Sequence, residues 1–169
     1  MKYVRLLLMT LLLSISSQAW SAEFFDLGFG DFEEELALAR DDGKKGVFVF
    51  FEMDDCPFCQ RMRETILLEP EVIAYFRAHF KNYTFDILGG SPVVDFDGTE
   101  YDTGKDMAEK KYRVRATPVM IIFDLEGKPV ARFTGPARNK EVLIMFGEYA
   151  VSGSYKEMPF TRYKRAQSK

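Results

Sequence analysis

Residues 48–59 read Phe-Val-Phe-Phe-Glu-Met-Asp-Asp-Cys-Pro-Phe-Cys, and this stretch decides the fold. Residues 47–51 are apolar throughout, which is typical of a central strand buried on both faces. Acidic residues follow, and two cysteines then bracket a Pro-Phe pair where a helix is expected to begin. Cys56 and Cys59 are the only cysteines of the chain, so any thiol chemistry takes place here.

The composition indicates one ordinary globular domain. The chain has 169 residues, of which 47% are hydrophobic and 29% charged. The net charge of −3 gives no reason to expect a nucleic acid as partner.

The first residues have the pattern of a secretory signal peptide. Lys2 and Arg5 precede an apolar run, residues 6–15, and small residues follow up to position 22. A spanning helix needs about 20 apolar residues, so this run is too short for one. We expect residues 1–21 to be a signal peptide cleaved after Ala19 or Ser21, with an uncleaved anchor as the alternative.

Export would place the cysteine pair in an oxidising compartment, such as the bacterial periplasm. A disulfide across only two intervening residues closes a tiny loop and constrains little of the unfolded chain. Stabilising the fold is therefore not the expected purpose of this pair.

Hydrophobic periodicity predicts alternating helices and strands in the first half of the chain. Asp31 is expected to cap the first helix, which closes near 41–43. A strand at 47–51 is followed by helices at 60–68 and 71–80 and by a strand at 82–88. This order predicts a βαβ arrangement with a partly parallel sheet.

The second half adds an insertion, two antiparallel strands and a last helix. Residues 89–103 form the insertion, with a hairpin expected around Asp97-Gly98. Thr103 is expected to cap a helix that runs to about residue 112. Strands follow at 117–124 and 130–134, and a helix at 139–151. The domain is thus expected to span residues 22–151.

Residues 152–169 form a polar, basic tail. We expect it to be a solvated, mobile end; docking on an acidic partner or on lipid headgroups is the alternative.

A Cys-x-x-Cys pair at a strand-to-helix junction has a physical logic. The free N–H groups and the dipole of a helix N-terminus favour the thiolate of Cys56, which is the reactive form. Cys59, about one helical turn later, can attack the mixed disulfide and release the partner. Pro57 suits the first helical position, where a missing N–H does no harm. Asp54 and Asp55 oppose the thiolate, so the reduction potential stays open.

Thr117-Pro118 is the second element of the expected site. A proline that opens a central strand is unusual unless its peptide bond is cis or its position faces a site. A cis bond would leave the Thr117 backbone free to pair with an extended peptide.

The cysteine stretch, Thr117-Pro118 and the Phe-Asp-Leu-Glu-Gly-Lys turn at 123–128 together resemble the thioredoxin superfamily, over residues 31–151. Residues 69–80, 94–99 and 113–118 look more narrowly like the exported thioredoxins of bacterial sulfur-oxidation systems, the SoxW type.

This resemblance implies an α/β thioredoxin-like fold, in which helices flank a mixed sheet and a short hairpin is inserted before the helix that precedes the cis-Pro strand. It implies a redox-active Cys56–Cys59 disulfide with cis-Pro118 packed against it. We expect Pro57, Phe58, Thr117 and Pro118 to contact the substrate; for Phe58, packing onto the insertion is the alternative. The implied function is a periplasmic thiol–disulfide oxidoreductase without a cofactor. Its partners would be a disulfide-bearing periplasmic protein and a membrane thiol donor of the CcdA or DsbD kind.

Two departures from thioredoxin itself concern the chemistry. Thioredoxin has Gly-Pro between its cysteines, whereas this chain has Pro57-Phe58. Thioredoxin also buries an aspartate six residues before its first cysteine, and that position here is Phe50. Glu52 is our candidate for the group that takes the proton of Cys59; otherwise it is a polar residue at a strand end.

Two other functions use the same cysteines. A general oxidant of secreted proteins would differ in reduction potential alone, whereas a non-catalytic carrier would hold a metal or sulfur species. Zinc usually needs four ligands, and the single histidine, His79, is twenty residues away, so we expect no metal. No dimerisation segment is evident, and we expect a monomer.

Overall fold

The computed structural model describes residues 23–28 and 30–167. The expected signal peptide, residues 1–21, lies outside the described residues. Within the described ranges, no helix is both long and apolar enough to cross a membrane.

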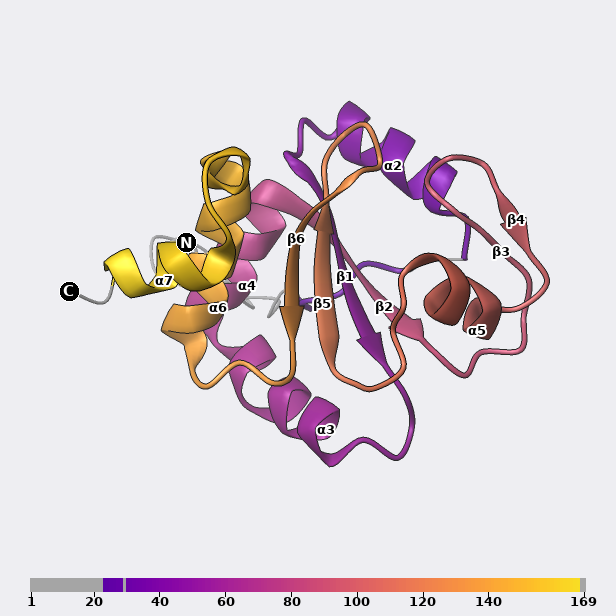
Figure 1. Ribbon diagram of the computed structural model, residues 1–169, viewed down its shortest axis with the longest axis horizontal. Coiled ribbons are helices and arrows are strands. Elements are labelled where there is room, and N and C mark those ends of the chain that lie inside the picture. The colour runs from indigo at the N-terminus through magenta and orange to yellow at the C-terminus, as the bar shows by residue number, and fades with distance from the viewer. Residues whose placement is uncertain (1–22, 29, 168–169) are drawn as a thin grey trace, which may run out of the picture.

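A four-stranded mixed sheet forms the centre of the molecule (Figure 1). Its strands, in the spatial order β2-β1-β5-β6, are Phe80–Asp86, Gly46–Glu52, Val119–Phe123 and Pro129–Thr134. β1 pairs with β2 in parallel and with β5 antiparallel, and β5 pairs antiparallel with β6. The thioredoxin-like α/β arrangement predicted from the sequence is confirmed.

Helices cover both faces of the sheet. In Figure 1, α3, α4 and α6 lie on one side, while α2, α5 and the small β3–β4 hairpin lie on the other. The bounds of these elements are α2 Phe32–Asp41, α3 Pro57–Glu64, α4 Pro70–His79, β3 Val93–Val94, β4 Glu100–Tyr101, α5 Gly104–Asp106 and α6 Lys140–Val151.

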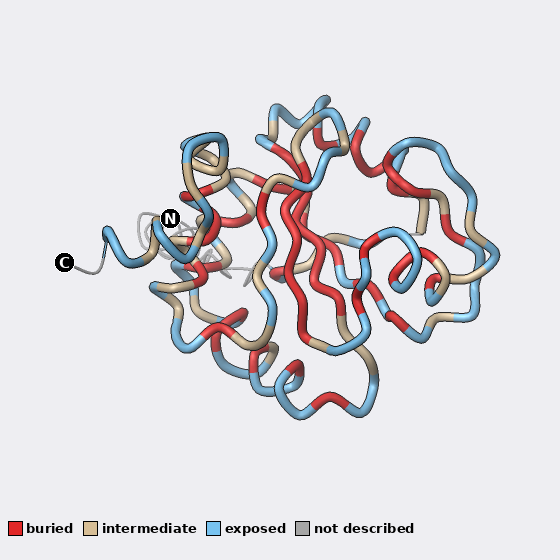
Figure 2. The backbone as a smooth tube through the Cα atoms, viewed as in Figure 1, coloured by how far each residue is buried: buried red, intermediate tan, exposed pale blue. Residues whose placement is uncertain are grey.

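Alternation along β1 divides the core into two halves. Phe48 and Phe50 pack with α3, α4 and α6, whereas Val47, Val49 and Phe51 pack with α2 and the insertion. All five side chains are buried, as the central strand in Figure 2 shows. The prediction of a strand buried on both faces is confirmed, and it explains why this run has no polar residue before Glu52.

Side-chain caps fix where several helices begin. Asp31 Oδ1 accepts a hydrogen bond from the Glu34 N–H (3.0 Å), and Thr103 Oγ1 accepts one from the Asp106 N–H (3.1 Å). Asn139 caps α6 in the same way. Both caps that the sequence predicts, Asp31 and Thr103, are confirmed.

The helix predicted at 60–68 is shorter than expected. α3 ends at Glu64, and a separate 3-10 turn, η1, covers Ile66–Leu68. Thr65 separates the two, and its hydroxyl donates to the Arg61 carbonyl oxygen (2.6 Å). Threonine competes in this way for backbone groups of a helix, which is why the helix stops at this β-branched residue.

The insertion contains the predicted hairpin, but the helix predicted after it, from Thr103 to about residue 112, is not regular. α5 has only three residues and continues as a π-helix, η2, over Met107–Lys111. The Tyr112 N–H donates to the Met107 carbonyl (3.2 Å), the wider spacing of a π turn. Tyr112 is thereby placed so that its hydroxyl donates to the buried carboxylate of Asp95. Burial is the main cause that raises the pKa of Tyr112, and the hydrogen bond with Asp95 raises this pKa further.

The C-terminal tail differs from the expectation of a solvated, mobile end. η3 covers Ser154–Lys156 and α7 covers Phe160–Gln167. The Phe160 ring lies 5.3 Å from that of Phe146, and the Tyr163 ring lies 5.3 Å from that of Tyr149, both on α6. Two aromatic residues three positions apart thus give α7 one apolar face that packs on α6, although most of its other residues are polar.

Candidate active site

The two cysteines lie at the carboxyl end of β1, where α3 begins. Cys56 is the N-cap residue of α3, and its Sγ accepts a hydrogen bond from the Cys59 N–H (3.1 Å). The two residues form a disulfide with their Cα atoms 5.2 Å apart. The sulfur of Cys56 therefore occupies the position at which a helix binds negative charge.

The local sequence explains this geometry. The Cys56 N–H donates to the Asp54 carbonyl oxygen (2.9 Å), which turns the chain between β1 and α3. Pro57 is the first helical residue, as predicted, and the Gln60 N–H donates to the Cys56 carbonyl oxygen (3.0 Å) to close the first turn. Proline needs no N–H partner at this position, so it starts the helix without cost.

A pocket of about 320 Å³ opens beside the disulfide. It is lined by Glu52, Met53, Asp54, Cys56, Cys59, Gln60 and Arg63. Both cysteines are buried, whereas the Phe58 side chain between them is 57% exposed. Pro57 is exposed as well. The structure thus places an apolar, accessible residue directly beside a sheltered disulfide.

Thr117 and Pro118 lie at the same end of the sheet as the cysteines, beside the carboxyl end of β1. Their peptide bond is cis. Val119, the next residue, pairs with Phe51 of β1, so the chain before it lies beside the chain that leads to Cys56. Pro118 is buried, and Thr117 is half-buried with a buried Oγ1 that has no hydrogen-bond partner in the described residues.

Glu52 is held by two side chains. Its carboxylate accepts hydrogen bonds from Arg63 Nε (2.7 Å) and Nη2 and from the Thr84 hydroxyl. The guanidinium group of Arg63 also lies over the Phe25 ring, 4.8 Å from its centroid. The hydrogen bonds with Glu52 raise the pKa of Arg63.

The contacts of Glu52 with these two side chains were not predicted from the sequence. Arg63 follows Cys59 by four residues, and this spacing puts both on one face of α3, so the signal was present. Thr84 lies on β2, and only the pairing of Phe50 with Thr84 brings it close. Nothing in a single sequence indicates that pairing.

Phe50 occupies the position six residues before Cys56. Its side chain is fully buried, and its ring lies 5.9 Å from that of Phe25. The residue at this position is therefore part of the hydrophobic core and cannot exchange a proton with Cys59.

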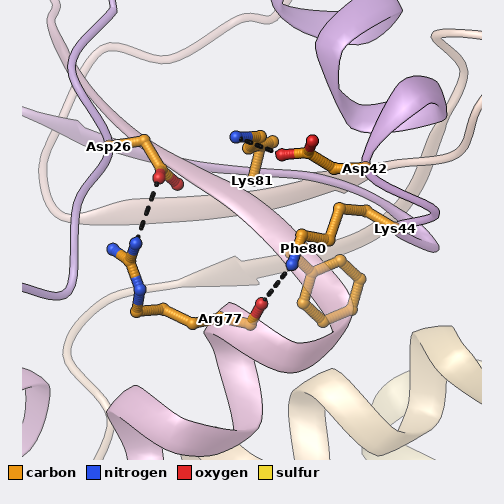
Figure 3. A pocket seen from close by; sticks show the side chains of 6 residues that line it. All are labelled: Asp26, Asp42, Lys44, Arg77, Phe80 and Lys81. Carbon is orange, nitrogen blue, oxygen red and sulfur yellow. Dashed lines mark hydrogen bonds and ion pairs between the residues drawn. The ribbon is translucent and has the colours of Figure 1, made fainter. Parts of the chain in front are cut away.

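A second pocket, of about 110 Å³, lies at the other end of the sheet (Figure 3). Its cations already have partners: Lys81 pairs with Asp42 (2.6 Å) and Arg77 with Asp26 (3.6 Å). The Lys44 ammonium group donates to the Arg77 carbonyl oxygen (2.7 Å). Because these interactions connect separate segments, we assign this pocket to the fold rather than to a ligand.

In residues 23–28 and 30–167, no three His, Cys, Asp or Glu side chains are grouped so that they could hold a metal ion.

Comparison with solved structures shows the fold. A thioredoxin-fold protein from Helicobacter pylori superposes with a TM-score of 0.60 at 18% identity, covering 75% of this chain and 86% of that one. A thioredoxin from Thermus thermophilus gives 0.59 at 24% identity, covering 82% and 94%. The oxidised C-terminal domain of DsbD from Neisseria meningitidis gives 0.51 at 16% identity, covering 68% and 89%. No curated protein sequence matches the chain.

The family itself is shown by a sequence model. The model of the thioredoxin-like domain matches residues 32–150, from the start of α2 almost to the end of α6. This range includes the Cys-x-x-Cys pair at disulfide distance and the cis-Pro segment. The chain therefore belongs to the thioredoxin-like domain family, with a fold of the disulfide-oxidoreductase type.

Proposed function

We propose that the protein is an exported thiol–disulfide oxidoreductase that reduces disulfides of partner proteins. The observation that carries the proposal is the position of Cys56 Sγ. It caps α3, accepts the Cys59 N–H and is bonded to the Cys59 sulfur, beside an open pocket. A sulfur in this place is stabilised as a thiolate once the disulfide is reduced.

The reaction uses two thiol–disulfide exchanges. The Cys56 thiolate attacks one sulfur of the partner's disulfide; that S–S bond breaks, and the leaving thiolate takes up a proton. The Cys59 sulfur, after losing its proton, then attacks Cys56 Sγ. The mixed disulfide breaks, the partner leaves with two thiols, and the protein keeps both oxidised sulfurs as the Cys56–Cys59 disulfide.

The setting of this reaction is inferred from the sequence. The signal-peptide pattern of residues 1–21 supports a periplasmic location, and the resemblance to SoxW-type proteins supports a component of sulfur oxidation as the partner. A membrane thiol donor of the CcdA or DsbD kind would then restore the reduced state. Pro57, Phe58, Thr117 and Pro118 are proposed to contact the partner's peptide, because all four adjoin the disulfide or its edge of the sheet.

The reduction potential tests the direction of electron flow. A reductant is expected near about −270 mV, whereas a general oxidant would lie near about −120 mV. Equilibrating the purified protein with defined ratios of reduced and oxidised glutathione, followed by thiol alkylation, measures this value. A potential at the oxidising end would replace our proposal with the oxidant. Bound metal that elutes with the reduced protein, together with absent reductase activity, would favour the non-catalytic carrier.

We further propose that Glu52 takes the proton from Cys59 during the second exchange. The carboxylate lines the pocket of the disulfide, and its side chain is only 17% exposed. Glu52→Gln removes the proton acceptor but leaves the shape, so the release of the mixed disulfide should slow by about 10- to 100-fold. Stopped-flow release of a fluorescent thiol from the mixed disulfide measures this step.

Glu71→Gln is the control for this variant. Glu71 lies on the exposed side of α4, where it pairs with Lys140 (3.1 Å), and its side chain is 67% exposed. The control loses the same charge far from the disulfide and should release the thiol at the wild-type rate. If Glu52→Gln also releases it at that rate, Glu52 is a polar residue at a strand end.

A further inference from the structure

Two arginines in the segment before Pro118 form no ion pair within the described residues. Arg113 and Arg115 are exposed, and none of the ion pairs within residues 23–28 and 30–167 includes either of them. This contrasts with the pocket of Figure 3, where Lys81 and Arg77 both have carboxylate partners.

The two arginines lie in a domain that is acidic overall. Residues 23–151 contain 16 basic and 25 acidic residues, a net charge of −9, so neighbouring carboxylates are plentiful. Arg113 and Arg115 line an open hollow of about 650 Å³ together with Glu109 and Lys110. Lys110 is paired with Asp106 (2.9 Å), and Glu109 offsets one of the two arginine charges, so the hollow keeps one excess positive charge.

The backbone holds this segment in a fixed shape. Arg113 has φ = 53°, the left-handed region that residues with side chains rarely adopt and that recurs at functional sites. Arg132 on β6 donates from Nη1 to the Tyr112 carbonyl oxygen (2.7 Å) and from Nη2 to that of Arg113 (3.5 Å). The turn that carries the two arginines is therefore held in place by hydrogen bonds from β6.

The segment that carries the two arginines leads directly to the cis-Pro part of the redox site. Arg115 precedes Thr117 by two residues, so their Cα atoms lie within about 7 Å of each other. The pairing of Phe51 with Val119 brings this segment to the edge of the sheet where β1 leads into Cys56 (Figure 1).

The two loops that meet at this end of the sheet carry charges of opposite sign. Asp54 and Asp55 are exposed in the loop before Cys56, whereas Arg113 and Arg115 are exposed in the loop before Pro118. A negatively charged partner would therefore be repelled by the first loop and attracted by the second.

We propose that Arg113 and Arg115 form a docking surface for an acidic segment of the protein whose disulfide Cys56 attacks. This inference rests on the proposed function and adds the class of substrate. Guanidinium groups suit the purpose because they bind carboxylates with two parallel hydrogen bonds. Exposed ion pairs add little affinity each, but complementary charge speeds the encounter and orients the partner.

The test compares three synthetic peptides that share one disulfide and differ in a flank of glutamates, glutamines or lysines. The full chain, reduced beforehand, should reduce the glutamate peptide about fivefold faster than the glutamine peptide at low salt. The lysine peptide should be the slowest. The preference should vanish near about 0.5 M salt, because the screening length then falls to a few ångströms.

The decisive variant is the double substitution Arg113→Asn and Arg115→Gln. Asparagine tolerates the left-handed backbone at position 113. The rate ratio between glutamate and glutamine peptides should fall to about one. The control is Lys45→Gln with Lys128→Gln, which removes two exposed charges from the opposite end of the sheet and should keep the wild-type ratio.

The outcomes separate this inference from the proposed function. If the wild-type protein reduces no peptide, the proposed function fails, and fluorescence anisotropy with the cysteines replaced by serines still tests docking. Binding of the glutamate peptide that is lost only in the arginine variant supports the inference. An unchanged ratio or affinity in that variant, an equal loss in the lysine control, or displacement by inorganic phosphate at matched ionic strength overturns it.

Discussion

Replacing Cys56 by serine is expected to lower the disulfide-reductase activity of the protein by more than about 10³-fold, because no other nucleophile is present to replace it. The chain contains only one other cysteine, Cys59, which lies within α3 and is 2% exposed. Turbidity from insulin reduction with dithiothreitol measures the loss. Wild-type activity in Cys56→Ser would refute the proposed mechanism.

Serine is the informative replacement because it keeps the structural role of Cys56. A serine hydroxyl can accept the Cys59 N–H bond that Sγ now accepts (3.1 Å), so α3 remains capped. Alanine loses this cap as well, and Cys56→Ala should unfold about 1 kcal/mol more easily than Cys56→Ser when both are reduced. The two variants therefore separate the chemistry of the sulfur from its contribution to the helix.

The reciprocal variant, Cys59→Ser, should accumulate the mixed disulfide between Cys56 and its partner, in addition to losing activity. Cys56 can still attack a partner, but no thiol at position 59 is left to release it. The mixed disulfide is then stable enough to be isolated and identified by mass spectrometry. Its absence, with Cys56 shown to be reduced, would contradict the order of attack.

Truncating Phe76 to alanine is expected to lower the free energy of unfolding by about 3–5 kcal/mol, the cost of a large cavity in a packed core. Phe76 is fully buried on α4, and its ring contacts those of Phe48 (5.0 Å), Phe24 (5.5 Å) and Phe80 (5.7 Å). Because domains are stable by only about 5–15 kcal/mol, this variant should be close to unfolding at 37 °C.

Phe58→Ala is the matched control, since it deletes the same atoms from a side chain that is 57% exposed. Its stability should stay within about 0.5 kcal/mol of the wild type. Urea denaturation of the oxidised proteins, monitored by circular dichroism, gives both values. A small loss in Phe76→Ala, or an equal loss in both variants, would show that the aromatic cluster is not the centre of stability.

The parts of the fold that could be predicted are those specified by neighbouring residues. The apolar run 47–51, the caps Asp31 and Thr103 and the Asp97-Gly98 hairpin depend on local spacing, and each is present. The placement of Cys56 at a helix N-terminus is local in the same sense, because a strand, two acids and Cys-Pro follow one another directly.

Other features depend on contacts between distant residues and could not be predicted. The π-helix η2 is coupled to the hydrogen bond between Tyr112 and Asp95, seventeen residues apart. α7 has eight residues, too few to be stable alone, and its packing against α6 decides its structure. The hydrogen bond from Thr84 to Glu52 depends on the register between β1 and β2, which the sequence alone does not reveal.

The packing of α7 on α6 extends the folded unit beyond the region that the family model matches. The family's shared region stops at residue 150, yet Phe160 lies against Phe146 and the Tyr149 hydroxyl donates to the Met158 carbonyl oxygen (2.7 Å). The region matched by the family model and the packed unit therefore end at different residues. α7 lies beyond the match, yet its partly buried Phe160 and Tyr163 pack against the core, so a boundary at residue 150 would separate α7 from the helix that it covers.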